Sequence, residues 1–585
     1  MLELIKPILK KSRILLLLIF YLLYSGINES FVYKSLAFYY LLIFCSCISV
    51  VYFCFRNAIG SKLKVHFSFL IIISSLLIIL PFVIRVITGQ VEWYFLSYFV
   101  SVFVLFLALT LNIDNNYISK KKISWVIIAF AFCESLKCIL QDFNIIESGK
   151  IFHVTGTNNN PNITAMFLVM IFPLVLSKLL EVNKLKNKIS ILFLIIIICF
   201  AIYLLKSRTA YIGIFIVSIA YLLYYLIQIK KTNNYITYSV LTLFVITGLF
   251  LTPKLYELKR NSADGRQFIW KVSMKMIAEK PFVGYGYGMV QGAYNIAQAD
   301  YFKNNETTTI EKKNATYVTN IFNDYLEMFI QGGFLGGIFY ILFIIGALII
   351  GVTNIKKSFD PVVGVAVFAV MGCFNFSFYS PQVVLIFVYF AAIICANTNE
   401  KSRILFINKY ISSLFFVSAI VLLIFFLVQA HSQIQLKKVQ QLIVERQPDE
   451  AQTLIDNNVN CISTSELYYR TLGNIQIEKK NFKAASEYYS AAFKYAATPQ
   501  LAMQIAYCQI QTLNFDEAVS YLQFASRVQP ALFEPQYHLM NLYHNLGKEN
   551  MAKYYAQIIL NKEVKISSGR IYKYKIEALN LLKRK

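Results

Sequence analysis

Long apolar runs recur along most of this chain, and they limit what it can fold into. Runs of roughly 17–25 residues, each long enough for a helix to cross a bilayer, follow one another from Arg13 to Ala430 and then stop. Hydrophobic residues make up 57% of the chain and charged residues only 15%, a composition unlike that of a soluble protein. We therefore expect an all-α protein with two units, a polytopic membrane helix bundle at 1–430 and a soluble domain at 431–585.

The apolar runs predict about thirteen membrane-spanning helices. Their expected limits are 13–28, 36–55, 66–88, 93–112, 123–141, 161–179, 189–205, 209–228, 235–252, 324–350, 361–377, 382–397 and 411–430. Lysine and arginine gather in every second loop, and the positive-inside rule makes those loops and the N-terminus cytoplasmic. The odd number of helices then places residues 431–585 and the long 253–323 loop outside. The net charge of +25 is therefore attributed to membrane orientation, and no nucleic-acid partner is expected.

The soluble domain contains an internal repeat. Alanines 34, 33 and 34 residues apart each follow a turn and begin a second helix: Ala451, Ala485, Ala518 and Ala552. This pattern resembles the tetratricopeptide repeat, an α-solenoid of helix pairs. We expect the first unit to continue from the last membrane helix and a basic helix near 571–585 to cap the stack. Such a stack usually binds a partner, and a purely structural role is the alternative. Whether Cys461 and Cys508 form a disulfide stays open.

Four polar segments on the predicted outer face are candidates for a functional site. They are Gly-Thr-Asn-Asn-Asn-Pro-Asn at 156–162, Lys-Ser-Arg-Thr-Ala at 206–210, the stretch 264–288 and the stretch 323–337. Phe268, Val272 and Met276 lie at helical spacing and predict an amphipathic helix over 265–279, with Arg266 in its first turn. A diphosphate docked at that helix N-terminus would also be held by Arg266, because the planar arginine fork binds two oxygens at once. Arg208 would add a second cation, and interfacial anchoring is the alternative for either arginine alone.

Other features of the outer half have simpler interpretations. The glycine series at 284–288 follows no strand of a βαβ unit, so we expect a tight turn rather than a dinucleotide loop. The glycine pairs at 332–337 are expected to allow close helix packing. Glu134, Lys137 and Arg85 are charged residues within or near the membrane and therefore functional candidates. Glu134 and Lys137 could instead pair with each other at i, i+3.

Together, in this order, the four segments resemble the O-antigen ligase and O-antigen polymerase superfamily, over roughly residues 130–400. The resemblance implies a GT-C-like bundle in the bacterial inner membrane that makes lipopolysaccharide or another surface polysaccharide. Such enzymes transfer a glycan from undecaprenyl diphosphate to an acceptor hydroxyl on the periplasmic face, without a metal or cofactor. The implied partners are this donor, membrane lipids and a lipid A core, glycan or protein acceptor. The resemblance also implies that Arg208 and Arg266 engage the donor diphosphate.

One position departs from the family pattern. Many ligases carry a histidine immediately before the Asn-Asp pair, where this chain has Phe322, so the role of that histidine cannot be carried over. The catalytic candidates, besides the two arginines, are Asp324, Glu327 and His153. The expected substrate-binding residues are Asn160, Asn162, Lys206, Trp270 and Asn323.

Several functions fit this sequence. Ligation to lipid A core, polymerisation of repeat units and transfer to protein hydroxyls are three enzyme subtypes, and the repeat domain favours the first or the third. A flippase or exporter of lipid-linked sugar is the alternative outside the enzymes. A transporter should place charged residues along a path through the bilayer midplane. Here most of them lie on one face, which favours an enzyme.

Overall fold

The structure is a computed structural model. It describes residues 69–88, 92–229, 260–397 and 409–583, with gaps at 117, 148–151, 159, 306, 459–464 and 566. It also describes part of 47–54, two short strands at 63–66 and 404–407, and isolated residues between 235 and 257. The expected span at 13–28, and most of those at 36–55 and 235–252, lie outside the described residues.

The other expected spans correspond to helices in the described part of the chain. They are α3 Phe69–Thr88, α4 Trp93–Asp114, α5 Lys120–Asp142, α6 Pro161–Glu181, α7 Leu185–Leu204, α8 Arg208–Tyr224 with the short π-helix η1 Tyr225–Ile229, α13 Asp324–Thr353, α14 Ile355–Gly372, α15 Pro381–Ala396 and α16 Lys409–Val444. Eight helices among the described residues are long and apolar enough to cross a membrane. The chain is therefore a helical, multi-pass membrane protein, as predicted.

α15 lies at the centre of the bundle because nearly all of its side chains are apolar and buried. It packs against α4, α6, α13 and α14. The rings of Phe368 in α14 and Phe387 in α15 stack with their centroids 3.9 Å apart. Phe378, just before α15, lies 5.3 Å from Phe99 of α4 in the same aromatic core. A helix that is apolar all round has to be enclosed by other helices, and α15 therefore forms the core of the bundle.

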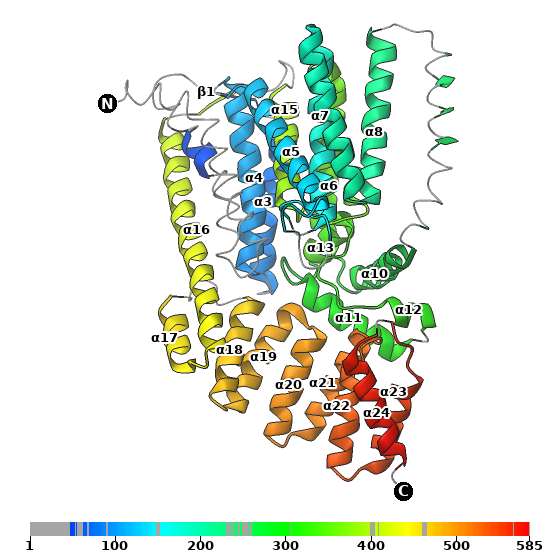
Figure 1. Cartoon of the computed structure of the whole chain (residues 1–585). Helices are drawn as coiled ribbons and strands as arrows, with labels where there is room; N and C mark the ends of the chain where they lie inside the picture. The colour runs from blue at the N-terminus through cyan, green and yellow to red at the C-terminus, as the bar shows by residue number, and fades with distance from the viewer. Residues whose placement is uncertain are drawn as a thin grey trace.

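Among the described residues, the predicted lysine-rich loops at 120–122, 184–188 and 356–357 lie at the starts of α5, α7 and α14, at the end of the bundle opposite the soluble domain (Figure 1). Lys120 at the start of α5 donates to the side chain of Asn397, which in turn donates to the carbonyl of Lys357 at 3.0 Å. Strand β1 (Leu63–His66) pairs antiparallel with β2 (Ile404–Ile407) at the same face. This two-stranded ribbon is the one departure from an all-α fold among the described residues, and no sequence pattern predicted it.

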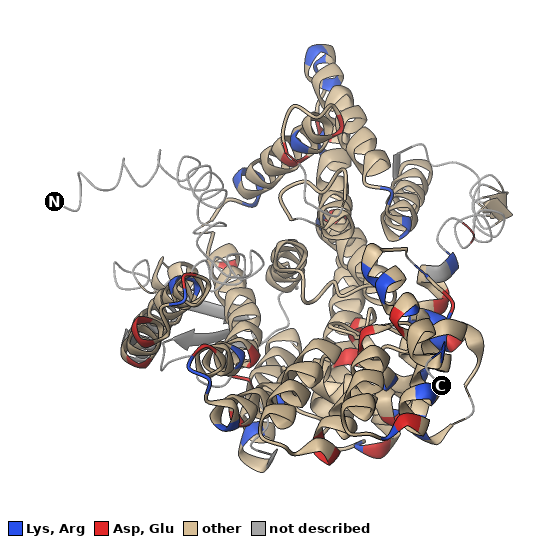
Figure 2. Cartoon of the chain, turned by 60° about the horizontal axis from the view of Figure 1, so that its bottom comes forward, with Lys and Arg blue, Asp and Glu red and all other residues tan. Residues whose placement is uncertain are grey.

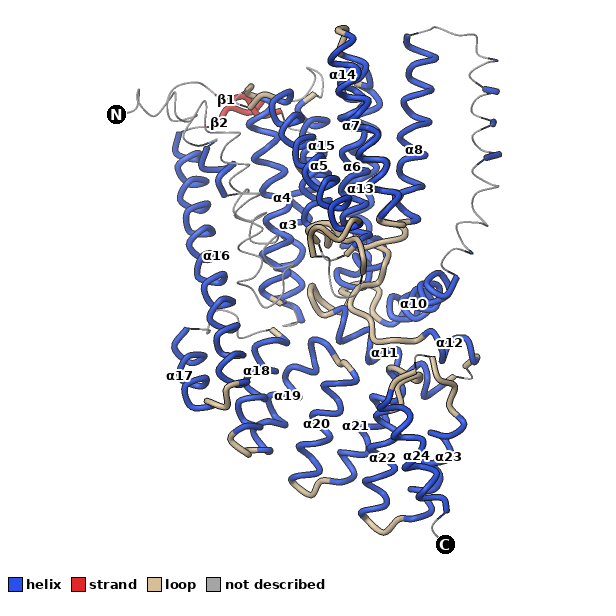
Figure 3. The backbone as a smooth tube through the Cα atoms, viewed as in Figure 1, coloured by secondary structure: helices blue, strands red, loops and turns tan. Residues whose placement is uncertain are grey.

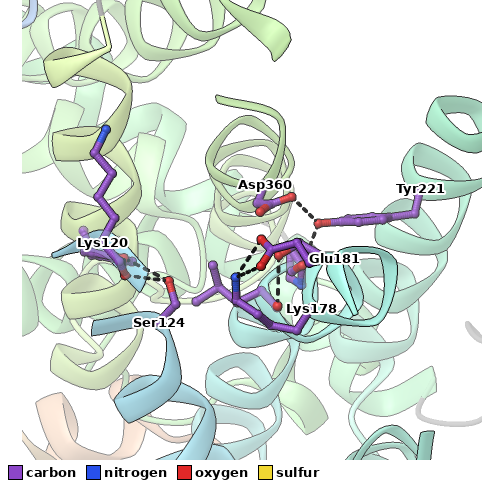
Figure 4. A network of polar contacts seen from close by, with 10 residues as sticks. Lys120, Ser124, Lys178, Glu181, Tyr221 and Asp360 are labelled. Carbon is purple, nitrogen blue, oxygen red and sulfur yellow. Dashed lines mark hydrogen bonds and ion pairs between the residues drawn. The ribbon is translucent and has the colours of Figure 1, made fainter. Parts of the chain in front are cut away.

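A polar network joins α6, α8 and α14 near this same face (Figure 4). The buried ammonium of Lys178 pairs with Glu181 at 2.7 Å. The hydroxyl of Tyr221 donates to Asp360 and to the carbonyl of Pro173, both at 2.6 Å. The network thus satisfies polar groups that a bilayer could not.

The opposite face carries the loop helices and the soluble domain. The loop helices are α10 Arg260–Glu279, α11 Val290–Asn304 and α12 Thr309–Asn314, and the soluble domain contains α17 Pro448–Asn458, α18 Glu466–Glu478, α19 Phe482–Ala496, α20 Pro499–Gln511, α21 Phe515–Val528, α22 Glu534–Asn545, α23 Glu549–Asn561 and α24 Gly569–Lys583. Charged side chains are spread over these helices, whereas the membrane helices are charged mainly at their ends (Figure 2).

The soluble domain is a stack of helix pairs, in which α18 packs on α19, α20 on α21 and α22 on α23. The four repeating alanines lie near the starts of α17, α19, α21 and α23, and each is fully buried. A small side chain there lets paired helices approach closely. α16 runs without a break from the membrane into this domain, and α24 packs on the last pair at the end of the stack, as the sequence predicted.

α13 is bent by the segment 281–288. Gly333 has φ +61° and ψ −158° inside the helix, and a Cβ there would lie 2.2 Å from the carbonyl oxygen of Phe282. The amide of Tyr285 donates to the carbonyl of Ile330 at 2.7 Å, and the amide of Phe334 donates to the carbonyl of Pro281 at 2.7 Å. The prediction of one continuous helix over 324–350 was wrong, because the glycine turn replaces the helical hydrogen bonds at Gly333.

Candidate functional site

The candidate site lies where loops from the membrane helices meet the loop helices (Figure 3). Arg208 is the first residue of α8, and the buried Ser207 precedes it as N-cap residue. Lys206 takes a left-handed conformation with φ +48°, which makes the turn between α7 and α8 tight, as expected. A cation at a helix N-terminus opposes the helix dipole, so this position favours an anion nearby.

Arg266 is held against residues 373–380, which connect α14 to α15 and are called the α14–α15 link below. Its Nη1 donates to the carbonyl of Phe374 at 2.6 Å, and its Nη2 donates to Oδ1 of Asn375 at 3.4 Å. The buried Asn375 donates from Nδ2 to the hydroxyl of Thr209 at 2.7 Å. Asn375 thus connects Arg266 to the residue that follows Arg208.

The two arginines are close enough to repel each other. Burial, and then the charge of Arg208, lower the pKa of Arg266 to about 10. The guanidinium therefore stays charged at neutral pH, and an anion bound beside both groups would relieve the repulsion. The structure thus brings together the two arginines that the sequence singled out.

The predicted position of Arg266 within its helix was wrong. α10 begins at Arg260, not at 265, so Arg266 lies in the second turn. Backbone amides beyond the first turn already have partners inside the helix, so the helix N-terminus cannot hold an anion at Arg266. The binding capacity of this position resides in the guanidinium.

Phe322 supports Arg266 from the other side. Its backbone is left-handed with φ +56°, and its ring lies 4.9 Å from the Arg266 guanidinium carbon. The ring of Phe376, in the α14–α15 link, packs edge-on against it with centroids 5.5 Å apart. The residue that replaces the family's histidine is therefore an aromatic platform for the arginine.

Asn323 and Asp324 hold the same link. Asn323 is the N-cap of α13, accepts from the amide of Leu326 at 3.1 Å and donates to the carbonyl of Cys373 at 3.1 Å. Asp324 is fully buried and accepts from the amide of Phe378 at 3.0 Å. Its other oxygen, Oδ1, accepts no hydrogen bond from the described residues. Both side chains thus fix the wall on which Arg266 rests.

Glu327 and Trp270 hold the backbone of Ile321. Glu327 is buried and accepts from the amide of Ile321 at 3.2 Å. The indole of Trp270 donates to the carbonyl of Ile321 at 3.2 Å. Gln331 connects Glu327 to the hydroxyl of Tyr379, with hydrogen bonds of 3.4 and 2.7 Å. These contacts orient the chain that leads into Phe322.

The loop at 152–160 packs on α5 through Glu134. This carboxylate accepts from the amide and the hydroxyl of Thr157, both at 2.6 Å, while Lys137 donates to the same hydroxyl at 3.4 Å. Glu134 and Lys137 therefore meet at Thr157. Gly156 has φ +67°, and a Cβ there would lie 2.3 Å from Glu134, so only glycine fits this turn.

The remaining predicted residues occupy the edge of the site. Asn160 is the N-cap of α6 and accepts from the amide of Asn162 at 2.9 Å. Lys206 is exposed. His153 is exposed too, with its Nε2 at 3.6 Å from Asp142, and this contact is with α5 rather than with the arginines.

No sequence pattern indicated the α14–α15 link. Asn375 nevertheless lies between the two arginine-bearing elements, and the link also contacts Asn323 and Asp324. An amide inside an aromatic stretch between two apolar runs was the available signal. Gln382, just after the link, also donates to Asn158 of the 152–160 loop.

These features define a multi-pass helical membrane protein with a partly buried, arginine-centred site at one end of its bundle. Residues 191–341 match the O-antigen ligase family, a stretch that contains Arg208, Arg266 and Asp324 but not the α14–α15 link. The ComP-specific O-oligosaccharyltransferase of Acinetobacter baylyi (strain ATCC 33305 / BD413 / ADP1) is 26% identical over 313 residues, or 49% of this chain and 54% of that protein. Both matches support the resemblance to the O-antigen ligase superfamily that the four polar segments indicated. The chain spans about half the length of this relative.

Proposed function

We propose that the protein is a glycosyltransferase that moves a glycan from undecaprenyl diphosphate to an acceptor hydroxyl on the periplasmic face of the bacterial inner membrane. The observation that carries this proposal is the pair Arg208 and Arg266, joined through Asn375 and Thr209. Two cations held together in a partly buried site favour an anion with several oxygens, which a diphosphate supplies.

The proposed reaction is a displacement at the anomeric carbon of the donor glycan. The acceptor oxygen forms a bond to this carbon while the bond to the diphosphate oxygen breaks, and undecaprenyl diphosphate leaves with the electron pair. Negative charge grows on the leaving oxygen, and cations that are already in place stabilise it without reorganisation. Inversion at the anomeric carbon is the expected stereochemical outcome.

The proton of the acceptor hydroxyl passes to a base, for which Asp324, Glu327 and His153 are the candidates. Asp324 and Glu327 accept hydrogen bonds from backbone amides of the site walls, which supports a positioning role for both.

Among acceptors, we propose a protein hydroxyl. The relative from Acinetobacter baylyi is named for its action on the protein ComP. In addition, the helix pairs of the soluble domain, which we propose are tetratricopeptide repeats, lie beside the loop helices (Figure 1) and are suited to grip a polypeptide. Lipid A core and a growing glycan are the alternative acceptors, and the transfer assay separates them.

The test is transfer in vitro from a synthetic undecaprenyl-diphosphate glycan, with the purified full chain, EDTA and no ATP. Wild type is compared with Arg266→Ala and with the control Lys312→Ala, a change at an exposed lysine of α12. Transfer that survives EDTA, collapses in Arg266→Ala and persists in the control supports the proposal, and the labelled product identifies the acceptor. Absence of transfer to all three acceptors, with lipid-linked sugar moved across liposomes, would establish the flippase alternative instead.

A further inference from the structure

A cavity of about 770 Å³ lies between the loop helices and the soluble domain. It is lined by α10, α11, the end of α3 and the end of α19, and its size is typical of ligand sites, at roughly 300–1,000 Å³. Lys275 of α10 and Lys280, which directly follows this helix, line the cavity, about 13–21 Å from Arg266 at 1.5 Å per residue along the helix. The cavity is therefore separate from the arginine site but close enough for one large substrate to reach both.

Cations outnumber carboxylates in the lining of this cavity. Arg85, Lys275, Lys280 and Lys494 line it together with Glu279 and Asp300. In the part of the chain that the structure describes, none of the three lysines forms an ion pair with a carboxylate. Lys275 donates to Asn305 at 3.2 Å, and Lys280 lies 4.5 Å from the centre of the Tyr285 ring. The cavity therefore carries more positive than negative charge.

The lining of the cavity is partly apolar and partly aromatic. Val272, Met276 and Ile296 are among its apolar residues, and Tyr285, Tyr301 and Tyr495 are its tyrosines. The hydroxyl of Tyr285 donates to Glu279 at 2.8 Å, which engages one of the two carboxylates. Tyrosine and methionine are enriched in protein–protein contact sites, and charged groups there meet opposite charges on the partner.

The wall contributed by the soluble domain is held in place by backbone contact. A Cβ on Gly292 of α11 would lie 2.3 Å from the carbonyl oxygen of Lys494, so α11 and the end of α19 meet without an intervening side chain. The ring of Tyr495 stacks on that of Tyr469 with centroids 6.2 Å apart. The backbone of Lys494 and the ring of Tyr495 are thereby held in the lining of the cavity.

We propose that this cavity binds an acidic segment of the polypeptide acceptor, close in sequence to the residue that is glycosylated. This inference rests on the proposed function and names the feature of the acceptor that the enzyme recognises. The lysines, which form no ion pair among the described residues, favour acidic side chains on the ligand. The apolar lining residues accommodate the aliphatic side chains beside them. An anionic oligosaccharide fits less well, because its hydroxyl-covered surface would desolvate against Val272, Met276 and Ile296 without hydrogen-bond partners.

The test measures binding of a fluorescein-labelled peptide, Glu-Leu-Glu-Ser-Glu-Leu, to the full-length protein in detergent by fluorescence anisotropy. The peptide with lysine in place of glutamate is the probe control. The variant is the double change Lys275→Glu and Lys280→Glu, the matched control is Lys312→Glu on exposed α12, and thermal unfolding shows that each variant is folded. Lys275→Gln with Lys280→Gln removes the charge without reversing it.

Wild type should bind the acidic peptide more tightly than the basic one, and added salt should weaken that binding. The double reversal should weaken it by about tenfold or more, the glutamine pair by less, and Lys312→Glu should leave it unchanged. Equal binding by wild type and the folded double reversal would overturn the proposal. Binding of tetragalacturonate at this cavity, without binding of the acidic peptide, would overturn it in favour of a glycan site.

The same variants distinguish this inference from the proposed function. Transfer from the lipid-linked glycan to a small hydroxyl acceptor does not require the cavity, so the double reversal should retain that transfer. Failure of wild type to transfer, with intact peptide binding, contradicts the proposed function alone. Intact transfer with charge-independent peptide binding contradicts the cavity proposal alone.

Discussion

The side-chain amide of Asn295 in α11 donates a hydrogen bond of 2.8 Å to the carbonyl oxygen of Ala496, the last residue of α19. One turn further along α11, the side-chain amide of Gln298 donates a hydrogen bond of 2.6 Å to the carbonyl oxygen of Val528, the last residue of α21. The final carbonyls of a helix have no partner within it. α11 therefore caps the C-termini of two successive helix pairs, and this capping joins the loop helices to the soluble domain.

Replacement of Asn295 by alanine should loosen this junction. The change leaves the carbonyl of Ala496 and the amide of Val318, which donates to Asn295 at 2.9 Å, buried without partners, at a cost of about 1–3 kcal/mol each. Hydrogen exchange should rise at the end of α19 and at Val318. Gln291→Ala, at a partly exposed position of the same helix, is the control, and equal exchange in both variants would show that the capping is dispensable.

The bend in α13 should not tolerate a side chain at Gly333. Alanine there combines a left-handed backbone at φ +61° with a Cβ 2.2 Å from the carbonyl of Phe282, and the strain alone costs about 1–3 kcal/mol. Gly265→Ala is the matched control, since a Cβ at that position of α10 meets nothing within 4 Å. Thermal unfolding should show a clear loss for Gly333→Ala and a small gain for Gly265→Ala, of about 0.5–1 kcal/mol. Equal melting temperatures would contradict the assigned bend.

Loss of Arg266 should slow transfer. Arg266→Ala removes one preorganised cation and should lower kcat by about 10²- to 10³-fold. Arg266→Lys keeps the charge but cannot hold both Phe374 and Asn375, so its rate should fall between those of wild type and Arg266→Ala. Initial rates with the lipid-linked donor provide the measurement.

Arg208 and Arg266 should act on one ligand. The double variant Arg208→Ala with Arg266→Ala should therefore lose less than the product of the two single losses. Strictly multiplicative losses would show that the arginines act at independent sites. Because Asn375 connects the two elements, Asn375→Ala should weaken the same coupling, whereas a change at exposed Lys312 should not.

The stability of the contact between the bundle and the soluble domain should depend on pH through Glu92. Glu92 lies just before α4, and burial, followed by the charge of Glu466, raises its pKa from the ordinary 4.5 to about 8. Between these values the folded protein keeps a proton that the unfolded chain releases, so stability should fall as pH rises from about 4.5 to about 8. Glu92→Gln should flatten this part of the pH profile of the melting temperature, whereas Glu478→Gln at an exposed position should not. An unchanged slope in Glu92→Gln would rule out this origin.

The sequence by itself determined the helical membrane protein, the membrane helices in the described part of the chain and the helix pairs after α16. These features are local, since an apolar run or an alanine that recurs at a fixed spacing records burial directly in the order of residues. It also singled out Arg208 and Arg266 by residue type and turn context. It placed the start of α10 too late because the polar residues 260–264 carry no apolar period.

Only the tertiary structure decided how the site is assembled. The carbonyl that holds Arg266 belongs to Phe374, 108 residues further along the chain, and Asn375 acquires its role because α8, α10 and the α14–α15 link converge at one end of the bundle. The bend at Gly333 likewise depends on a segment that precedes α13. Helical hydrogen bonds join residues four apart and can be predicted from local pattern, whereas contacts between distant loops depend on how the helices pack.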